Sequence, residues 1–189
     1  KGSVKVDGVD VRDMTQKELR DKLGYVPQKG VLFSGTIDSN IRYGKPEITD
    51  AQVKEAAEVA QATEFIDTKP EKYESPVSQG GTNVSGGQKQ RLSIARAIAK
   101  EPEIFIFDDS FSALDFKTDS QLRKALKEYT KDATTVIVAQ RISTILGADQ
   151  IIVLDDGHMA GIGTHKELMA NCEVYQQIAR SQLSEEELA

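Results

Sequence analysis

The chain has 189 residues, which is enough for one domain, in one or two lobes, with a hydrophobic core of its own. Its 39% hydrophobic and 29% charged residues are typical of a globular protein, and the net charge of −6 argues against a general nucleic-acid or anionic-membrane surface. The one cysteine, Cys172, excludes an internal disulfide and suits a reducing compartment, and no apolar run is long enough for a membrane span.

The start of the chain predicts the edge of a sheet. Residues 3–11 alternate around Asp7-Gly8, which is a hairpin pattern. Residues 14–23 can form a short helical or irregular link. Residues 24–26 then predict a short strand that leads into a turn at Pro27-Gln28.

A largely helical lobe is predicted next, over residues 45–100. Thr49, with Gln52 three positions later, predicts a helix start, and apolar residues at helical spacing continue to Ala60. Residues 69–82 are rich in Pro, Gly and Ser and predict a loop.

A second helix start follows at Ser85, where Gln88 completes a capping pair. Gly86 and Gly87 leave the first backbone N–H groups uncovered, and with the helix dipole such a start can seat a phosphate. Taken alone, it is more often only a cap. The helix is expected to end at Glu101-Pro102.

Two adjacent acids, Asp108 and Asp109, follow the apolar residues 104–107. The run predicts a central parallel strand buried on both faces. Because ligands bind at the carboxyl ends of such strands, a carboxylate there suggests a nucleotide site that uses Mg²⁺. The alternative is an ordinary turn residue at the end of a strand.

Helices and strands alternate through the remaining residues. Residues 122–129 predict a helix face, Thr134–Val138 a buried strand, and residues 151–154 and 159–162 a hairpin. Thr164 with Glu167 predicts one helix, and residues 174–183 predict another. This alternation indicates an α/β fold with a mostly parallel sheet.

The whole chain resembles the ATP-binding cassette (ABC) of exporter-type transporters. The segments that carry the resemblance are NVSGGQ at 83–88 for the signature motif, IFIFDD at 104–109 for the Walker B strand, SALD at 112–115 for the D-loop, GYVPQ at 24–28 for the Q-loop, and LFSGTIDSNIRYG at 32–44. The resemblance implies a P-loop NTPase-like core with an inserted helical subdomain, truncated at its N-terminal end. Residues 1–44 and 101–183 would form the core, 45–100 the subdomain with the signature, and 184–189 a polar tail.

The resemblance also implies roles for individual residues. The metal would be held by Asp108, with Gln28 reaching the metal or the attacking water; a plain polar turn is the alternative for Gln28. The catalytic set would be Asp109, Gln140 and Gln28. ATP would be contacted by Gln28, Ser85, Gly86, Gly87, Gln88 and Asp115. In the family two cassettes face head to tail, so the signature would serve the ATP of the partner.

One motif of the family is absent from these 189 residues: the GxxxxGK[ST] loop, whose amides and lysine hold the triphosphate. We therefore expect these residues by themselves to bind ATP poorly.

Three positions depart from the family pattern. Asp109 stands where active cassettes usually carry Glu, which withdraws the carboxylate by about 1 Å. Gln140 stands where the family has a histidine, and an amide can supply neither positive charge nor a proton. Gln79-Gly80-Gly81 replaces a charged string near the membrane coupling helices, or is a plain connector.

The resulting hypothesis is the ATPase domain of an ABC exporter, resembling the degenerate-site half of a heterodimeric multidrug exporter. It would bind ATP and Mg²⁺ and work at the cytoplasmic face of the cell membrane with transmembrane domains and a second, non-identical cassette. The alternative is a regulatory module that binds ATP and dimerises with negligible catalysis of its own. A non-transport ABC ATPase is disfavoured. Tyr25, Phe33 and Tyr43 would dock a coupling helix or fill the core of the lobe.

Overall fold

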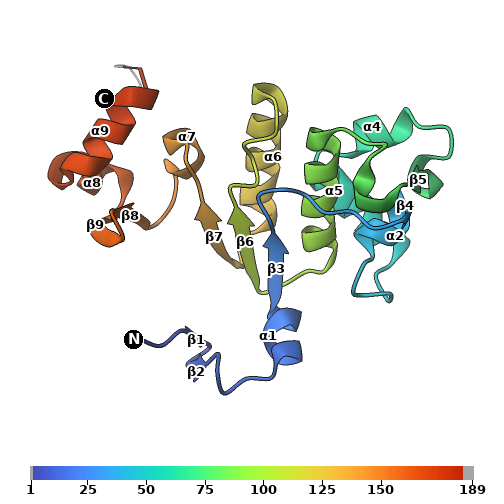
Figure 1. Cartoon of the computed structure of the whole chain (residues 1–189), viewed down its shortest axis with the longest axis horizontal. Helices are drawn as coiled ribbons and strands as arrows, with labels where there is room; N and C mark the ends of the chain where they lie inside the picture. Colours follow the sequence, from blue (N-terminus) through green and yellow to red (C-terminus); the bar gives the residue numbers. More distant parts are fainter. Residues whose placement is uncertain (1, 185–189) are drawn as a thin grey trace. The chain divides into compact units, whose positions relative to one another are not determined.

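The computed structural model describes residues 2–184 and divides into two compact units, Lys1–Val138 and Ala139–Ala189, which are treated separately below (Figure 1). Within residues 2–184, no helix combines the length and apolar character needed to cross a bilayer. The predicted polar tail lies outside the described residues, apart from Ser184.

The first unit opens with the predicted hairpin, formed by β1 (Lys5–Val6) and β2 (Val9–Asp10) in antiparallel pairing. Helix α1 (Gln16–Lys22) follows and is capped by Thr15. The hairpin forms a two-stranded sheet of its own, and within the described residues it is not paired with the three-stranded sheet.

The main sheet has three parallel strands in the order β3 (Leu23–Val26), β6 (Ile104–Asp108) and β7 (Thr134–Val138). Figure 1 shows the three arrows side by side, with β6 in the centre. The predicted central position of residues 104–107 is therefore confirmed. Parallel strands place their carboxyl ends at one edge of the sheet, which is where the candidate site lies.

Only one face of this sheet is covered within the described residues. Phe105 and Phe107 are 2% and 1% exposed and pack in one core with apolar residues of α5 (Gly86–Ala99) and α6 (Phe116–Tyr129). Ile104 and Ile106 point to the other face and are only half-buried. The prediction that this strand is buried on both faces is therefore wrong, and so is the prediction that β7 is buried.

The helical part of the first unit packs around α5. Its remaining elements are β4 (Gly35–Thr36), α2 (Ile37–Ile41), α3 (Asp50–Val59), α4 (Thr63–Asp67), the short 3-10 helices η1 (Lys72–Glu74) and η2 (Gln79–Gly81), and β5 (Pro76–Val77). The predicted loop at 69–82 therefore contains short elements, because β5 pairs with β4. Gly80 and Gly81 adopt φ values of 68° and 64°, which glycine tolerates best.

The second unit contains α7 (Ile142–Ile145), the antiparallel pair β8 (Ile151–Asp155) and β9 (His158–Gly163), α8 (His165–Asn171) and α9 (Glu173–Gln182). The predicted hairpin and both predicted helices are thereby confirmed. Leu168, Tyr175 and the free thiol of Cys172 lie in its small core.

Candidate functional site

The candidate site begins where β3 and β6 end side by side. Val26 and Phe107, the paired residues near these ends, are both buried, and their registry places the residues that follow them at one edge of the sheet. Asp108 is the last residue of β6, and Gln28 lies two residues after β3. Two segments 81 residues apart in the chain therefore contribute to one site.

Gln28 and Asp109 are in direct contact. The side-chain Nε2 of Gln28 donates a hydrogen bond of 3.1 Å to Oδ2 of Asp109. The backbone of Asp109 adopts a φ of 45°, and its N–H donates to the carbonyl of Val138 at the end of β7 over 2.8 Å. Aspartate is among the side chains that tolerate this left-handed conformation, so the turn that presents its carboxylate is accessible to this residue type.

Asp108 has a partner that the sequence did not indicate. The hydroxyl of Tyr25, on β3, donates to Oδ2 of Asp108 over 3.2 Å. Burial of the phenol, and then its hydrogen bond to Asp108, raise the pKa of Tyr25, so the hydroxyl is protonated at neutral pH and can donate. The register of the sheet explains the contact, because Tyr25 pairs with Ile106 and therefore shares a face of the sheet with Asp108.

The turn after Asp109 is fastened to the same edge. Ser110 is fully buried, and its hydroxyl donates to the carbonyl of Val26 over 2.8 Å. This bond ties the segment after β6 to the end of β3.

The start of α5 forms the predicted cap. The Ser85 hydroxyl accepts from the Gln88 N–H over 3.2 Å, and Gln88 Oε1 accepts from the Ser85 N–H over 3.1 Å. Ser85 and Gly86 are exposed, and a Cβ added at Gly86 would meet no heavy atom within 4 Å. The first turn of α5 is therefore open for an external ligand.

The signature lies beside the SALD segment rather than among the contacts of Gln28. A Cβ added at Gly87 would lie 3.6 Å from the carbonyl oxygen of Ala113. Asp115, at the end of SALD, caps α6 by accepting from the backbone and hydroxyl of Thr118 at 2.9 and 2.7 Å. Both bonds lower the pKa of Asp115, and the bond from the Thr118 backbone has the larger effect. The carboxyl group is therefore ionised at neutral pH.

Gln140 belongs to the second unit and follows β7 by two residues. It is exposed, and its backbone carbonyl accepts from Nε2 of Gln182 over 2.9 Å. Oε1 of Gln182 in turn accepts from the N–H of Ile142 over 2.9 Å, so α9 holds the segment that carries Gln140.

The three aromatic residues predicted to dock a coupling helix, Tyr25, Phe33 and Tyr43, lie at two separate positions in the first unit. Phe33 and Tyr43 stack with ring centroids 4.1 Å apart, and the guanidinium of Arg96 lies 5.3 and 5.4 Å from their centroids. Tyr25 is on the sheet, at Asp108. Because Tyr25 and Tyr43 are each 56% exposed, neither fills the core of the lobe.

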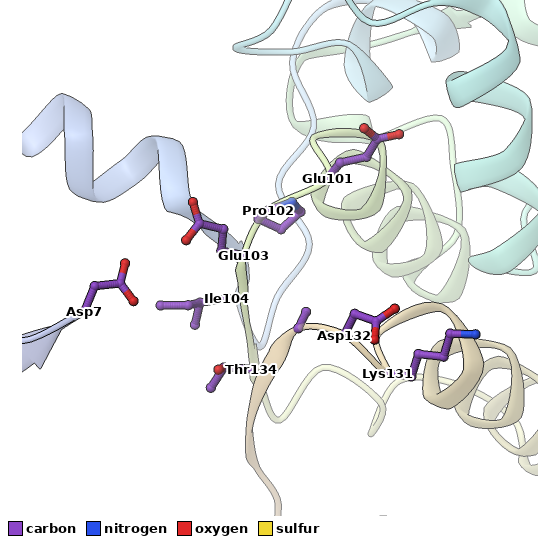
Figure 2. Close-up of a pocket in the computed structure, with 9 residues that line it drawn as sticks. Asp7, Glu101, Pro102, Glu103, Ile104, Lys131, Asp132 and Thr134 are labelled. Carbon is purple, nitrogen blue, oxygen red and sulfur yellow. The ribbon is translucent and has the colours of Figure 1, made fainter.

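A hollow of the first unit lies away from these residues. It measures about 630 Å³ and is lined by the residues that open β6 and β7, including Glu103, Ile104 and Thr134 (Figure 2). Two of the acidic residues drawn there, Asp7 and Glu103, form salt bridges with Lys22 at 3.0 and 2.8 Å. This hollow is at the amino-terminal edge of the parallel sheet, opposite to the edge that carries Asp108.

Comparisons with known proteins identify the family of this chain. A family model described as "ABC transporter" matches residues 1–112. An "Uncharacterized ABC transporter ATP-binding protein" of Mycobacterium tuberculosis is 47% identical over 184 residues, covering 96% of this chain and 31% of the relative. A "Putative multidrug export ATP-binding/permease protein" of Staphylococcus aureus is 44% identical over 177 residues, covering 94% of this chain and 31% of the relative.

A solved structure has the same fold. A bacterial Atm1-family ABC exporter with ATP bound matches 98% of this chain, and 33% of its own chain, with a TM-score of 0.93 and 39% identity. The α/β fold class with a parallel sheet is thereby confirmed. The chain belongs to the ABC transporter family, and it spans about a third of the length of the relatives that it matches.

Proposed function

We propose that this chain is the ATP-hydrolysing cassette of an ABC exporter, with a slow active centre of its own and a signature that completes the centre of a partner cassette. The observation that carries the proposal is the meeting of Gln28, Asp108 and Asp109 at the carboxyl edge of β3 and β6. In α/β proteins this edge is where ligands bind.

The donor atoms at this edge fit Mg²⁺. Carboxylate and amide oxygens are the ligands that this hard cation prefers, and Mg²⁺ is usually held by one or two carboxylates together with water and substrate phosphates. Within residues 2–184, no group of three acidic, histidine or cysteine side chains could hold a metal without such help. Asp108 would hold the ion, with Gln28 beside it. When bound with ATP, the ion neutralises charge on the phosphates.

Two residues support a slow active centre. Asp109 carries a carboxylate one methylene shorter than glutamate, and Gln28 already donates to it. A misplacement of about 1 Å at a reacting group can cost roughly a hundredfold in rate. Gln140 has a neutral amide that can donate a hydrogen bond but cannot supply positive charge to the transition state.

The exposed start of α5 supports the role toward a partner. Gly86 and Gly87 present backbone N–H groups at the positive end of a helix 14 residues long, and the N–H groups of Ser85 and Gln88 are bound within the cap beside them. Since Gly87 lies against Ala113, the signature and Asp115 would form one surface, which a second and non-identical cassette would face.

The remaining parts of the proposal come from the relatives. Because one of them is named for multidrug export and another is an exporter with ATP bound, we propose that the cassette works at the cytoplasmic face of the cell membrane with transmembrane domains. The stacked pair Phe33 and Tyr43 would receive a coupling helix of those domains.

The test restores the two departing residues in the full transporter. Asp109→Glu together with Gln140→His should raise hydrolysis at this site by about tenfold or more. The first change restores the longer carboxylate side chain, and the second restores the histidine that the family has at this position. Asp109→Asn is the matched control. It keeps a side chain that tolerates the left-handed turn, removes the charge, and should not raise turnover. Site-resolved hydrolysis that stays flat in the restored protein would contradict the proposed slow centre.

The second candidate is a regulatory module that binds ATP and dimerises without hydrolysing it. The same pair, Asp109 and Gln140, favours it. Assays of the paired cassettes with one half inactivated at a time separate the two: residual hydrolysis assigned to this half supports the enzyme, and none supports the module. A non-transport ABC ATPase is disfavoured by the negative net charge and by the exporter-like relatives.

A further inference from the structure

The side chain of Gln90 is an amide buried in the middle of α5, with only 1% of the residue exposed. A buried amide needs partners for both its donor and its acceptor. Gln90 finds both in the Q-loop turn: its Oε1 accepts from the N–H of Gly30 over 2.8 Å, and its Nε2 donates to the carbonyl of Pro27 over 3.0 Å.

These two backbone groups lie on either side of Gln28 and Lys29. Gly30 presses directly on α5, because a Cβ added there would come within 2.8 Å of the Lys89 carbonyl oxygen and of the Ser93 hydroxyl. The turn that carries Gln28 is therefore bound at both ends by one side chain and packed against the helix with no space between.

The contacts continue from the turn to the candidate catalytic acid. Gln28, at the tip of this turn, donates to Asp109 over 3.1 Å. The helix that holds the turn is the same helix that begins at Ser85. A shift of α5 would therefore move Gln28 relative to Asp109, since the bonds of Gln90 reach the turn of Gln28, whereas the N–H of Asp109 is bound to the carbonyl of Val138 on β7.

We propose that Gln90 is a positioning residue, which ties the Q-loop turn to the signature helix so that Gln28 reaches Asp109 only when α5 is in place. The inference rests on the proposed function, because it takes Gln28 and Asp109 as parts of the hydrolytic site. The proposed role of Gln90 links two parts of one cassette. The first is the signature helix α5, which would face a partner, and the second is the turn of Gln28, which contacts Asp109.

The experiment uses the full transporter with Gln90→Met, which keeps the volume of the side chain but removes the donor and the acceptor. Hydrogen exchange of the peptide over residues 27–33 should become about tenfold faster, because the Gly30 N–H loses its acceptor. The kcat for ATP should fall by about tenfold or more, with KM changed by less than about twofold, because the change displaces a reacting group without touching the nucleotide. The control is Ile94→Val, which trims an apolar residue of the same helix that is fully buried, and neither quantity should change.

A double-mutant cycle separates positioning from general stability. In a Gln28→Ala background, Gln90→Met should cause no further loss of kcat, because its effect passes through Gln28. The inference would be overturned if the two substitutions together lowered kcat by the product of their separate effects. It would also be overturned if the hydrogen-exchange rate were unchanged in Gln90→Met. Gly30→Ala, which wedges the turn off α5 with Gln90 intact, provides a second route to the same loss should Gln90→Met fail to fold. If neither the wild-type transporter nor any variant hydrolyses ATP, the proposed function fails. Hydrogen exchange at Gly30 still decides in that case whether Gln90 holds the turn.

Discussion

The side-chain amide of Gln28 donates to the carboxylate of Asp109 across 3.1 Å, although the two residues are 81 positions apart in the chain. The contact exists because β3 and β6 are parallel neighbours in register, so that the turn after one strand and the acid after the other meet at the same edge.

Replacing this donor by a carboxylate should inactivate the site. Gln28→Glu puts two acids about 3 Å apart, and like charges at that distance raise the pKa of one of them. We expect hydrolysis at this site to fall by about tenfold to a hundredfold, with a partial recovery at higher Mg²⁺. Lys29→Ala, an exposed neighbour in the same turn, is the control and should behave as wild type. Equal activity of the two variants would remove Gln28 from the site.

The signature helix offers a comparison between two similar caps. Ser85→Ala and Thr49→Ala each remove a complete capping box, and each should lower the free energy of unfolding by about 1 kcal/mol. Only Ser85→Ala should also reduce hydrolysis at the partner cassette, since only that helix start would face a nucleotide. Urea denaturation and partner-site ATPase assays measure the two effects. Equal ATPase losses in both variants would reduce the role of Ser85 to stability.

Local features of this fold could be predicted from the sequence, and long-range ones could not. The capping boxes at Ser85, Thr49 and Thr164 were recognised because each is complete within four residues. The prediction overestimated the burial of β6 and β7. An apolar strand can be covered by helices on both faces of the sheet, but its own sequence does not show whether those helices are present. Whether a helix covers each face depends on segments distant in the chain.

The candidate site shows the same division. Motif positions placed Gln28 and Asp108 near one edge, since strand ends and turns are local signals. The Tyr25 contact requires the register between β3 and β6, and the two bonds of Gln90 require α5 to lie against the turn after β3. Neither follows from the spacing of residues along the chain, because each joins segments at least 60 residues apart.

Tyr25 gives a prediction on the metal. Tyr25→Phe removes the hydroxyl that donates to Asp108 over 3.2 Å and keeps the ring on the sheet. Hydrogen-bond partners of metal ligands typically contribute tenfold to a hundredfold in metal affinity, so the Mg²⁺ concentration for half-maximal ATPase activity should rise by about tenfold. Tyr43→Phe, which removes the hydroxyl of an aromatic residue stacked on Phe33, is the control. A Mg²⁺ requirement unchanged in Tyr25→Phe would separate Tyr25 from metal binding.

Tyr129 predicts how stability changes at alkaline pH. Burial, with smaller contributions from Glu101 and Glu55, raises its pKa from 10.0 to about 12. The folded protein therefore retains the phenolic proton to higher pH than the unfolded chain does, so this contribution to stability is fully present below pH 10 and is lost as the pH rises through about 12.

Tyr129→Phe should remove this component. Between pH 10 and 12 its free energy of unfolding should fall less than that of the wild type, by an amount on the order of 1 kcal/mol after allowance for the half-exposed ring. At pH 7 the two proteins should differ little, because the lost bond from the hydroxyl to the Ile98 carbonyl is long, at 3.4 Å. Parallel curves in urea denaturation across this range would contradict the prediction.

The 189 residues by themselves should bind ATP poorly. The residues they place at the candidate edge are an amide and two carboxylates, Asp108 and Asp109, and carboxylates repel a triphosphate unless a cation lies between them. The loop amides and the lysine of a GxxxxGK[ST] sequence, which would offset that repulsion, are not among these residues. Titration calorimetry of the folded chain with Mg²⁺ and ATP should give a dissociation constant on the order of 1 mM or weaker. A micromolar constant, retained when Asp108→Asn removes the metal ligand, would show that these residues hold the nucleotide by contacts other than those assigned here.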